Sequence, residues 1–283
     1  MKVGIVGRAD RAVAWEKHLR PHKSVSEVII ANKLNGVGKV DACLLLNESE
    51  DRLQQLLKAV KIGYHTFLIA PLPIKTALVE KVYHAAQESN VLLQFSHWPT
   101  LAPASKWMAK KVSKPSFIQI IREVSHPEFL ESDHDFNYYW IDELAFCLRW
   151  VNSAVHHIDL KTVELSGNRL YALHMFLRFD SGATANIYIN TASAKTRHNR
   201  LAANNNFILD CNVVEQTVRQ GEENTNGHLY FDKQSFDATK AAELSALEFL
   251  KSVQMNRQTI YNGYHLLELT KTIDKIKKRL ARA

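Results

Sequence analysis

The stretch KVGIVGRADRA, residues 2–12, contains the first signal of the fold. It opens with a five-residue apolar run, which predicts a short strand, and Gly7 then allows a tight turn. Similar apolar runs follow in SEVIIAN, DACLLLN, TFLIA and VLLQFS, with helical stretches between several of them. Strands that are apolar throughout are typical of parallel strands buried on both faces. The first part of the chain is therefore predicted to be α/β, with a doubly wound parallel sheet.

The second part of the chain has a different pattern. LYALHMFLRF, residues 170–179, places side chains alternately on two faces, and the turn signal Asp180-Ser181-Gly182 then leads into ATANIYINT as a partner strand. SFIQIIREV and NNFILDCNVV predict further strands, and two helices, about Thr239–Met255 and Gly263–Arg282, close the chain. This pattern predicts an α+β domain with an open, largely antiparallel sheet that has helices on one side.

The composition is that of a globular protein, with 46% hydrophobic and 23% charged residues in a chain of 283. This length suggests about two domains. No apolar run approaches the ~20 residues that a membrane helix requires, and the start MKVGIVGRADR lacks the apolar stretch of a secretory signal. The three cysteines lie far apart, which favours buried, reduced thiols. We therefore expect a cytoplasmic protein that has no membrane partner.

The net charge of +7 raises the question of a nucleic-acid partner. Most of this charge lies in residues 271–283, where six basic residues and one acid give +5. Apolar residues recur at three- and four-residue steps from Leu266 to Leu280, so the region is predicted to be an amphipathic helix. Cations near a helix C-terminus interact favourably with the helix dipole. We expect a solvated basic helix end and no nucleic-acid binding.

Five segments resemble, in order and spacing, motifs of the Gfo/Idh/MocA family of NAD(P)-dependent oxidoreductases: KVGIVGRADRA, KVDACLLLN, GYHTFLIAPL, LRFDSGATANI and ELSALEFLKSVQMNRQ. Together they span nearly the whole chain. The resemblance implies a Rossmann dinucleotide-binding domain at residues 1–115 and a substrate and dimerisation domain at residues 116–283. It also implies a nicotinamide cofactor and, as substrate, a small hydroxylated or carbonyl compound.

The chain departs from this family where the family keeps its acid–base groups. GYHTFLIAPL aligns without a gap with the family pattern G-K-H-V-L-x-E-K-P-L, so Ala70 stands at the position of the lysine, before Pro71. Alanine has no group that transfers a proton. The family's Asp-x-x-x-His pair falls on Tyr139 and Glu143, and a shift of one residue offers Asp142 instead.

These departures leave two functions open. In the first, the chain is an oxidoreductase in which Glu143, Tyr139 or His97 carries the proton. In the second, it is a non-catalytic binding or regulatory protein that kept the fold. Glu143 also fits a helix-face carboxylate paired with a lysine, and His97, in FSHWPTLAP, fits a histidine hydrogen-bonded inside a packed loop. The histidines and cysteines lack the spacing of a metal site, so no metal is expected.

The resemblance also implies which residues contact the dinucleotide. The G-x-G-x-x-G fingerprint becomes Gly7, Ala9 and Ala12, so the tight turn is kept but a methyl group stands where the backbone approaches the pyrophosphate. The free N–H groups at the start of the following helix still suit a phosphate. Arg8 is a candidate partner for this phosphate, and an exposed loop arginine is its alternative interpretation.

Asn32 and Lys33 follow the second predicted strand, where an acid would bind the ribose 2′-hydroxyl. This pair suits a 2′-phosphate, so the sequence predicts NADP over NAD. The alternative is a strand-end turn with a solvated lysine. Asn47, after the third strand, and Pro71, in the loop after the fourth, complete the predicted cofactor contacts.

A homodimer is also predicted. LYALHMFLRF has apolar residues on both faces of its strand, with Leu173, Met175 and Leu177 on one face and Leu170 and Phe176 on the other. Helices cover one face of the predicted sheet. The other face then keeps an apolar patch, which a second subunit is expected to cover.

Overall fold

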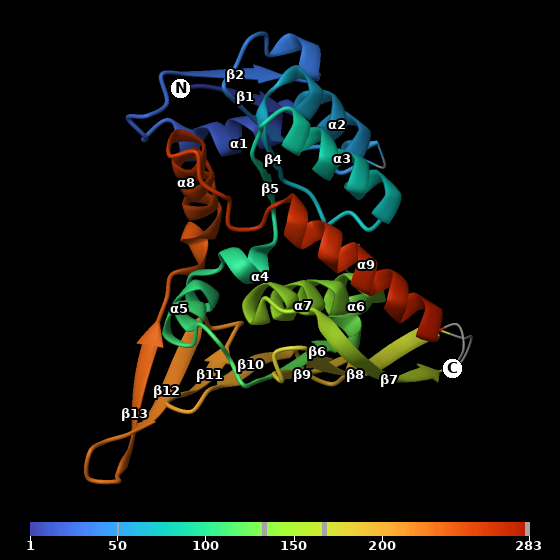
Figure 1. Cartoon of the computed structure of the whole chain (residues 1–283), viewed down its shortest axis with the longest axis vertical. Coiled ribbons are helices and arrows are strands. Elements are labelled where there is room, and N and C mark those ends of the chain that lie inside the picture. Colours follow the sequence, from blue (N-terminus) through green and yellow to red (C-terminus); the bar gives the residue numbers. More distant parts are fainter. Residues whose placement is uncertain (50, 132–134, 166–168, 281–283) are drawn as a thin grey trace. The chain divides into compact units, whose positions relative to one another are not determined.

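The computed structural model describes residues 1–49, 51–131, 135–165 and 169–280, which form two compact units (Figure 1). The first unit comprises Met1–Leu101 and Thr239–Lys271, and the second comprises Ala102–Ala238 and Thr272–Ala283. This division differs from the predicted boundary, which assigned all of residues 116–283 to the second domain. The physical reason is helix α8, Ala241–Gln254, whose apolar residues complete the core of the first unit.

The first unit is built on a five-stranded sheet in the order β2-β1-β3-β4-β5. All four strand pairings are parallel. Strands β1, β3 and β4 are buried along almost their whole length, as their continuous apolar runs predicted. The doubly wound parallel sheet is therefore confirmed. The strands are β1 (Lys2–Val6), β2 (Glu27–Ala31), β3 (Ala42–Leu45), β4 (His65–Leu68) and β5 (Leu93–Phe95).

Helices cover both faces of this sheet (Figure 1). Helices α1 (Ala9–Leu19) and α8 lie on one face, and α2 (Arg52–Ile62) and α3 (Thr76–Glu88) lie on the other. Helix α9, Gly263–Leu280, was predicted to reach Arg282, but residues 281–283 lie outside the described residues. The short helical segments are η1 (Leu34–Gly36), α4 (Trp98–Leu101) and η2 (Ala238–Lys240).

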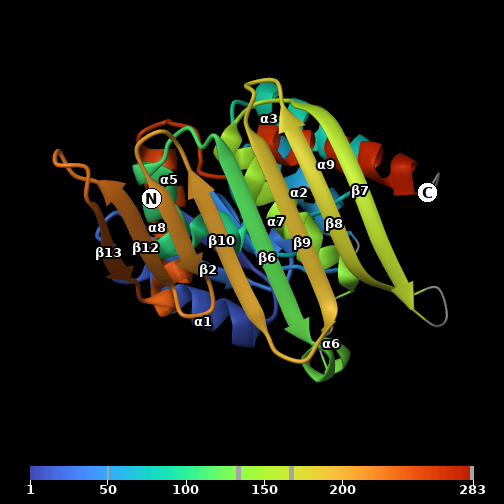
Figure 2. The same ribbon diagram turned by 90° about the horizontal axis from the view of Figure 1, so that it is seen from below.

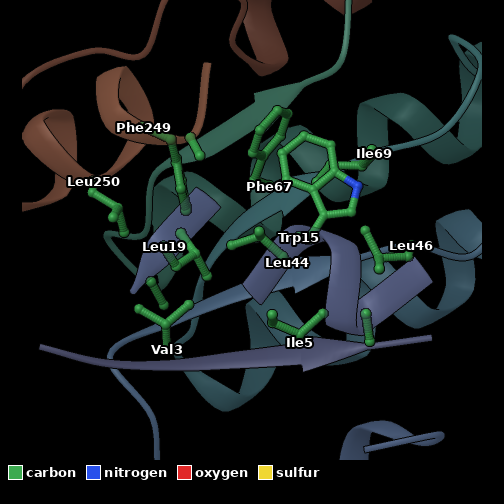
Figure 3. Packing of buried hydrophobic residues seen from close by; sticks show 13 residues of the cluster. Val3, Ile5, Trp15, Leu19, Leu44, Leu46, Phe67, Ile69, Phe249 and Leu250 are labelled. Atoms are coloured by element: carbon green, nitrogen blue, oxygen red, sulfur yellow. The ribbon is translucent and has the colours of Figure 1, made fainter. Parts of the chain in front are cut away.

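Figure 3 shows the core that joins α8 to the rest of the first unit. The ring of Phe67 on β4 lies 6.1 Å from the ring of Trp15 on α1 and 5.6 Å from the ring of Phe249 on α8. Leu19 of α1 and Leu250 of α8 are also buried in this cluster. Burying one large apolar side chain contributes about 1.5–3 kcal/mol to folding. Several such side chains therefore hold α8 firmly to the sheet.

The second unit is built on an eight-stranded sheet in the order β13-β12-β11-β10-β6-β9-β8-β7. Strands β6 and β9 pair in parallel, and the other pairings are antiparallel. This confirms the open, largely antiparallel sheet. The strands are β6 (Phe117–Ser125), β7 (Val155–Leu165), β8 (Arg169–Phe179), β9 (Thr184–Ser193), β10 (Arg197–Ala203), β11 (Ile208–Asn212), β12 (Thr217–Glu223) and β13 (Leu229–Ser235).

One face of this larger sheet carries helix α7, Phe136–Val151, which packs on β6, β8 and β9. Asp135 begins the helix, since its side chain accepts a hydrogen bond from the Tyr138 N–H at 3.1 Å. Helices α5 (Pro103–Lys111) and α6 (His126–Glu131) complete the unit. Figure 2 looks onto the opposite face of the strands, which no described helix covers. None of the described helices in the chain combines the length and apolar character needed to span a bilayer.

Candidate functional site

The carboxyl ends of β1, β2 and β3 surround a cavity of about 560 Å³ in the first unit. In doubly wound sheets, ligands bind at this edge, where neighbouring strands diverge in their connections. Strand β1 lies between β2 and β3, so the cavity occupies the point where the strand order reverses. It is lined by Val6, Gly7, Arg8, Arg11, Asn32, Leu46, Asn47, Glu48 and Gln55.

Gly7 forms the floor of the turn between β1 and α1. A Cβ atom at this position would lie 2.7 Å from the Cβ of Leu46, so only glycine fits between β1 and the loop after β3. The Gly7 N–H donates to the carbonyl of Ala31 at 3.1 Å, which ties the turn to β2. The residue kept from the G-x-G-x-x-G pattern is therefore the one that packing requires.

The start of α1 lies beside this turn and has no side-chain cap. Arg8 is exposed and pairs with Asp10 at 2.8 Å, and this hydrogen bond raises the pKa of its guanidinium. Ala9, the first residue of the helix, is also exposed and does not line the cavity. The uncapped N–H groups of the first helical turn are suited to an anion.

Asn47 lines the same cavity from the loop after β3. Its Oδ1 accepts hydrogen bonds from the N–H of Ser49 at 2.8 Å and from the Ser49 hydroxyl at 2.6 Å. Its Nδ2 donates to Asp51 at 3.2 Å. These bonds hold the loop that leads into α2, and Asn47 is therefore a fixed part of the cavity wall.

A second cavity of about 520 Å³ adjoins the first, since Asn32 and Gln55 line both. Its charged lining is entirely basic and consists of Lys33 after β2 and Lys58 and Lys61 on α2. None of these three ammonium groups has an ion-pair partner within the described ranges. The two cavities together offer an open turn, an uncapped helix start and a cluster of three positive charges.

The loop after β4 lies at the same edge of the sheet, next to the loop after β3. The hydroxyl of Ser96, at the end of β5, accepts from the Ala70 N–H at 3.0 Å and donates to the Ala70 carbonyl at 2.8 Å. Ala70 is buried, and Pro71 beside it is exposed and lines neither cavity. The backbone N–H and carbonyl of Ala70 are thus satisfied by a hydroxyl, without a titratable side chain.

His97 follows directly after this serine and is 1% exposed. Its Nδ1 lies 2.6 Å from the hydroxyl of Thr100, and its ring centroid lies 4.7 Å from that of Tyr261. The carbonyl of His97 also accepts the N–H groups of Thr100 and Leu101 at the start of α4. The structure thus places His97 inside a packed loop.

Glu143 lies on α7 in the second unit, at the centre of a buried ion cluster. Its side chain is fully buried, and Arg200 of β10 binds both carboxylate oxygens, with N–O distances of 2.9 and 3.0 Å. Arg122 of β6 and His198 of β10 approach the same Oε1 at 3.2 and 3.0 Å. The Arg200 guanidinium also donates to the hydroxyl of Ser105 at 3.0 Å. The expected lysine partner is therefore replaced by two arginines and a histidine.

These neighbours determine the charge of the cluster. Burial alone would raise the pKa of Glu143, but Arg200, His198 and Arg122 together hold it well below its usual range. Burial lowers the pKa of His198 to about 4, despite the nearby carboxylate. Glu143 is therefore an anion at neutral pH, and it is poorly suited to give up or take a proton.

Tyr139 and Asp142 lie on the same helix. Tyr139 is 5% exposed, its ring lies 4.8 Å from the guanidinium carbon of Arg122, and its carbonyl accepts from Arg122 Nη1 at 3.4 Å. Burial raises the pKa of Asp142 to about 7, although Arg122 acts in the opposite direction. Asp142 is thus the α7 carboxyl whose pKa lies near neutrality, as acid–base catalysis requires.

Five of the predicted cofactor contacts line the two adjoining cavities, whereas Ala9 and Pro71 line neither. Gly7, Arg8, Asn32 and Asn47 line one cavity, and Lys33 lines the adjoining one. His97 belongs to the first unit, whereas Tyr139 and Glu143 belong to the second. The partners of Glu143 were missed, because they come from distant strands and no local spacing marks them. Among the described residues, no group of three His, Cys, Asp or Glu side chains is arranged to hold a metal ion.

Comparison with known proteins gives a consistent fold. No protein-family model and no curated protein matches the sequence. Solved structures do match. UDP-N-acetylglucosamine 3-dehydrogenase from Acidithiobacillus ferrooxidans is 14% identical, with a TM-score of 0.79 over 96% of this chain and 95% of that one. A dehydrogenase from Chromobacterium violaceum is 13% identical, with a TM-score of 0.81 over 99% and 95%. GenD2 from gentamicin A biosynthesis, solved in complex with NAD, is 12% identical, with a TM-score of 0.71 over 97% and 92%.

These likenesses cover nearly the full length of both chains in each comparison. The five-stranded parallel sheet and the eight-stranded mixed sheet are thus the two parts of one known architecture. The identities of 12–14% agree with a sequence that has diverged from its structural relatives. This chain has the two-domain fold of the Gfo/Idh/MocA-type dehydrogenases.

Proposed function

We propose that this chain is an oxidoreductase-type protein that binds NADP(H) in preference to NAD(H), and that acts on or binds a small hydroxylated or carbonyl compound. The observation that carries this proposal is the pair of adjoining cavities at the carboxyl ends of β1, β2 and β3. The first offers the Gly7 turn and the uncapped start of α1 to a pyrophosphate. The second offers its lysines to a further phosphate.

The lysine-lined cavity is the basis for the choice of NADP. An acidic side chain at the end of the second strand binds the ribose 2′-hydroxyl of NAD, whereas positive charge accommodates the 2′-phosphate of NADP. This chain has Asn32 and Lys33 at that position. Lys58 and Lys61 are three residues apart on α2, so both reach the same side of the helix. A phosphate dianion would relieve the repulsion among the three ammonium groups.

A cofactor titration tests this proposal directly. Nicotinamide fluorescence is followed as the protein is titrated with NADPH and with NADH. We expect NADPH to bind more tightly, and Lys33→Asp to reverse the order. A hydrogen bond to a charged group contributes about 1.5–3 kcal/mol, so the change in relative affinity is at least about tenfold. Lys39→Asp is the matched control, since Lys39 is exposed and lines neither cavity. Equal affinities that Lys33→Asp leaves unchanged would refute the NADP assignment.

The proposed chemistry rests on the fold and on the described relatives. Two of the proteins compared above are dehydrogenases, and the third holds NAD. Hydride transfer depends strongly on proximity and orientation, which a bound dinucleotide beside a substrate supplies. Among the α7 carboxyl groups, Asp142 has the pKa best suited to proton exchange, about 7, and is the proposed acid or base.

A non-catalytic binding or regulatory role is the second candidate. It is favoured by Glu143, which is fully occupied by Arg200 and Arg122, and by Ala70 at the position of the family's lysine. The loss of a positioned acid or base typically costs about 10²–10⁴ in rate. NADPH oxidation measured over a panel of carbonyl compounds separates the candidates. Turnover that is lost in Asp142→Asn supports the enzyme, whereas tight NADPH binding without turnover supports the binding protein.

We also infer a homodimer that forms through the open face of the eight-stranded sheet. Phe231, Ile208 and Phe117 lie in one row across the strands, because their registered partners are Gly221 and Ala203 on the strands between them. Their exposed fractions are 76%, 55% and 40%. An exposed apolar row of this kind is typical of an interface. Light scattering is expected to show a dimer at micromolar concentration, and a monomer would refute it.

The thiols support a reducing compartment, and we place the protein in the cytoplasm. Cys43, Cys147 and Cys211 are all free and buried. Burial raises the pKa of Cys43 to about 12 and that of Cys211 to about 11, so neither thiol is a reactive thiolate.

A further inference from the structure

A separate cavity of about 230 Å³ lies in the first unit at the amino end of β5, whereas the cofactor cavity lies at the carboxyl ends of the strands. It is bounded by the end of α3, by residues 90–93 and by the segment 258–264 that leads into α9. Its polar lining consists of two phenols, four amides and one hydroxyl, from Tyr83, Tyr264, Gln87, Asn90, Gln258, Asn262 and Thr259. No lining residue carries a charge.

The walls of this cavity are fixed by hydrogen bonds along the free edge of β5. The hydroxyl of Thr259 donates to the carbonyl of Leu93, and the N–H of Phe95 donates to the carbonyl of Tyr261 at 3.0 Å. The segment 258–264 therefore lies against β5 almost as a further strand would. The cavity thus has two walls that are held in place before any ligand binds, and such preorganisation reduces the cost of binding.

The shape of the cavity depends on Gly263, the first residue of α9. A Cβ atom there would lie 3.2 Å from Cδ2 of Tyr83 and 3.4 Å from Cδ1 of Leu93. Asn262 caps the helix, since its Oδ1 accepts from the N–H of His265 at 3.2 Å, and His265 Nδ1 accepts from the N–H of Asn262 at 3.1 Å. The helix end is satisfied, so the cavity does not depend on a free helix terminus.

The polar side chains keep hydrogen-bonding capacity that the protein does not use. Gln87 Nε2 donates to the hydroxyl of Tyr83 at 2.9 Å, and Asn262 Nδ2 donates to Gln258 Oε1 at 3.3 Å. Three side-chain groups have no hydrogen-bond partner among the described residues. They are the amide oxygen of Gln87, the amide NH₂ of Gln258 and the whole side-chain amide of Asn90. The cavity therefore presents both donors and acceptors, and all of them are neutral.

From this lining we propose that the cavity at the amino end of β5 is a binding site for a neutral polyhydroxylated ring, such as a monosaccharide or a cyclitol. Ring hydroxyls both donate and accept hydrogen bonds, as the amides and phenols of the cavity do. The apolar C–H face of such a ring packs on an aromatic side chain, here Tyr83 or Tyr264. The volume lies below the roughly 300–1,000 Å³ of sites for drug-sized ligands, so a single ring is the size that fits.

The experiment measures binding of D-glucose and myo-inositol to the full-length protein by saturation-transfer NMR, with glucuronate and glucosamine as charged counterparts. Asn90→Gly removes one amide. It also suits the backbone, because Asn90 has a φ of +51°, a conformation that glycine adopts freely. Gly263→Ala introduces a methyl group into the cavity at a helix position that favours alanine. Asn152→Gly is the matched control, since it makes the same change at φ +51° in the second unit.

We expect the neutral rings to bind the parent protein and Asn152→Gly equally. Losing a hydrogen bond that contributes about 1 kcal/mol weakens binding roughly fivefold, which is the effect expected for Asn90→Gly. Gly263→Ala is expected to weaken binding by at least as much, with melting curves showing that both variants are folded. No neutral ring bound, equal binding of the charged counterparts, or binding unchanged in both cavity variants would each overturn the proposal.

Discussion

The two cavities at the carboxyl ends of β1, β2 and β3 and the buried cluster around Glu143 differ in how their polar groups are satisfied. Around the two cavities, Arg8 and Lys33 are exposed, and the N–H groups at the start of α1 have no side-chain cap. In the second unit, Glu143 and Arg200 are buried, and each carboxylate oxygen of Glu143 already has a partner. The polar groups of the first region are therefore available to a ligand, whereas the charged groups of the second region already pair with one another.

This difference indicates how a fold can keep one part of its function while another part changes. An open turn at a strand end needs few specific side chains, because backbone N–H groups bind the phosphate. Proton transfer needs particular side chains that are accessible and have a suitable pKa. A carboxylate buried between arginines, as Glu143 is, therefore loses its use as an acid or base, whereas a backbone site at a strand end does not depend on it.

Glu143→Gln is expected to have the largest effect. It leaves Arg200 buried beside a neutral amide, and removing one partner of a buried ion pair costs about 3–5 kcal/mol of unfolding free energy. Urea unfolding of the parent and the variant measures the change. Glu48→Gln is the matched control, because the Arg11–Glu48 pair, at 2.8 Å, is partly exposed and such pairs contribute about 0–1 kcal/mol. If both variants lose the same stability, the contrast between the two regions is wrong.

Ala70→Lys should destabilise the protein without restoring turnover. Ala70 is buried, and Ser96 already forms hydrogen bonds with its backbone N–H and carbonyl. A lysine ammonium group placed there would therefore be buried without a charged partner. Burying an uncompensated polar group costs about 1–3 kcal/mol in proteins. The measurements are steady-state NADPH oxidation over carbonyl compounds and a melting curve. Ala14→Lys, on the exposed face of α1, is the control for the added charge. A clear gain in turnover from Ala70→Lys would show that the site remains competent for catalysis.

Asp142→Asn should change how stability depends on pH. Burial raises the pKa of Asp142 to about 7 in the folded protein, from its ordinary value of 3.8. Its stabilising contribution is therefore present below pH ~4 and is lost as the pH rises to ~7, because the folded state then releases a proton. The lowered pKa of His198, about 4, acts with the opposite sign, since the unfolded chain takes up that proton first on acidification.

Comparison of the variant with the parent isolates Asp142, since His198 is common to both. Asp142→Asn should gain stability relative to the parent as the pH rises from 4 to 7. Melting temperatures at unit steps of pH measure this difference. A constant difference across that range would mean that the pKa of Asp142 is not raised.

Ala9→Gly should have the smallest effect on stability and a specific effect on binding. It restores the second glycine of the dinucleotide fingerprint, where the backbone approaches the pyrophosphate. Glycine within a helix costs about 0.5–1 kcal/mol relative to alanine, and Ala9 is at the exposed start of α1. We expect tighter NADPH binding and a slightly lower melting temperature. Ala14→Gly is the control, because it has the same cost in helix stability without changing the turn. NADPH binding that is no tighter in Ala9→Gly than in the parent would argue against a pyrophosphate at this turn.

Local patterns in the sequence were enough for most of the architecture. Continuous apolar runs predicted the buried parallel strands, and alternation with a turn at Asp180-Ser181-Gly182 predicted the antiparallel pair β8 and β9. Both patterns are local: each can be recognised within a few consecutive residues, because the periodicity of apolar residues reflects the direction in which side chains point. The helix 239–255 was also predicted, but its membership of the first unit was not, because periodicity does not identify the core that an apolar face joins.

The candidate site was predictable only in part. Gly7, Asn32, Lys33 and Asn47 follow strand ends, so their convergence at one edge follows from a parallel sheet. The environment of Glu143 depends instead on Arg122 and Arg200, which lie 21 and 57 positions away along the chain. The pairing register of β6 and β10 places the two arginines near each other, and α7 then packs on this sheet. The sequence alone does not reveal which residues of two distant strands lie opposite each other. The functional roles of all these side chains stay predictions.

Helix α8 has a consequence for the order in which the chain folds. The chain completes residues 1–101 early, passes through residues 102–238 of the second unit, and only then supplies Phe249 and Leu250 to the first core. During synthesis, the part of this core that α8 covers beside α1 therefore stays exposed until more than a hundred further residues have been made. Exposed apolar surface of this kind favours aggregation during folding. Helix α8 thus completes the core of the unit whose sheet was synthesised first.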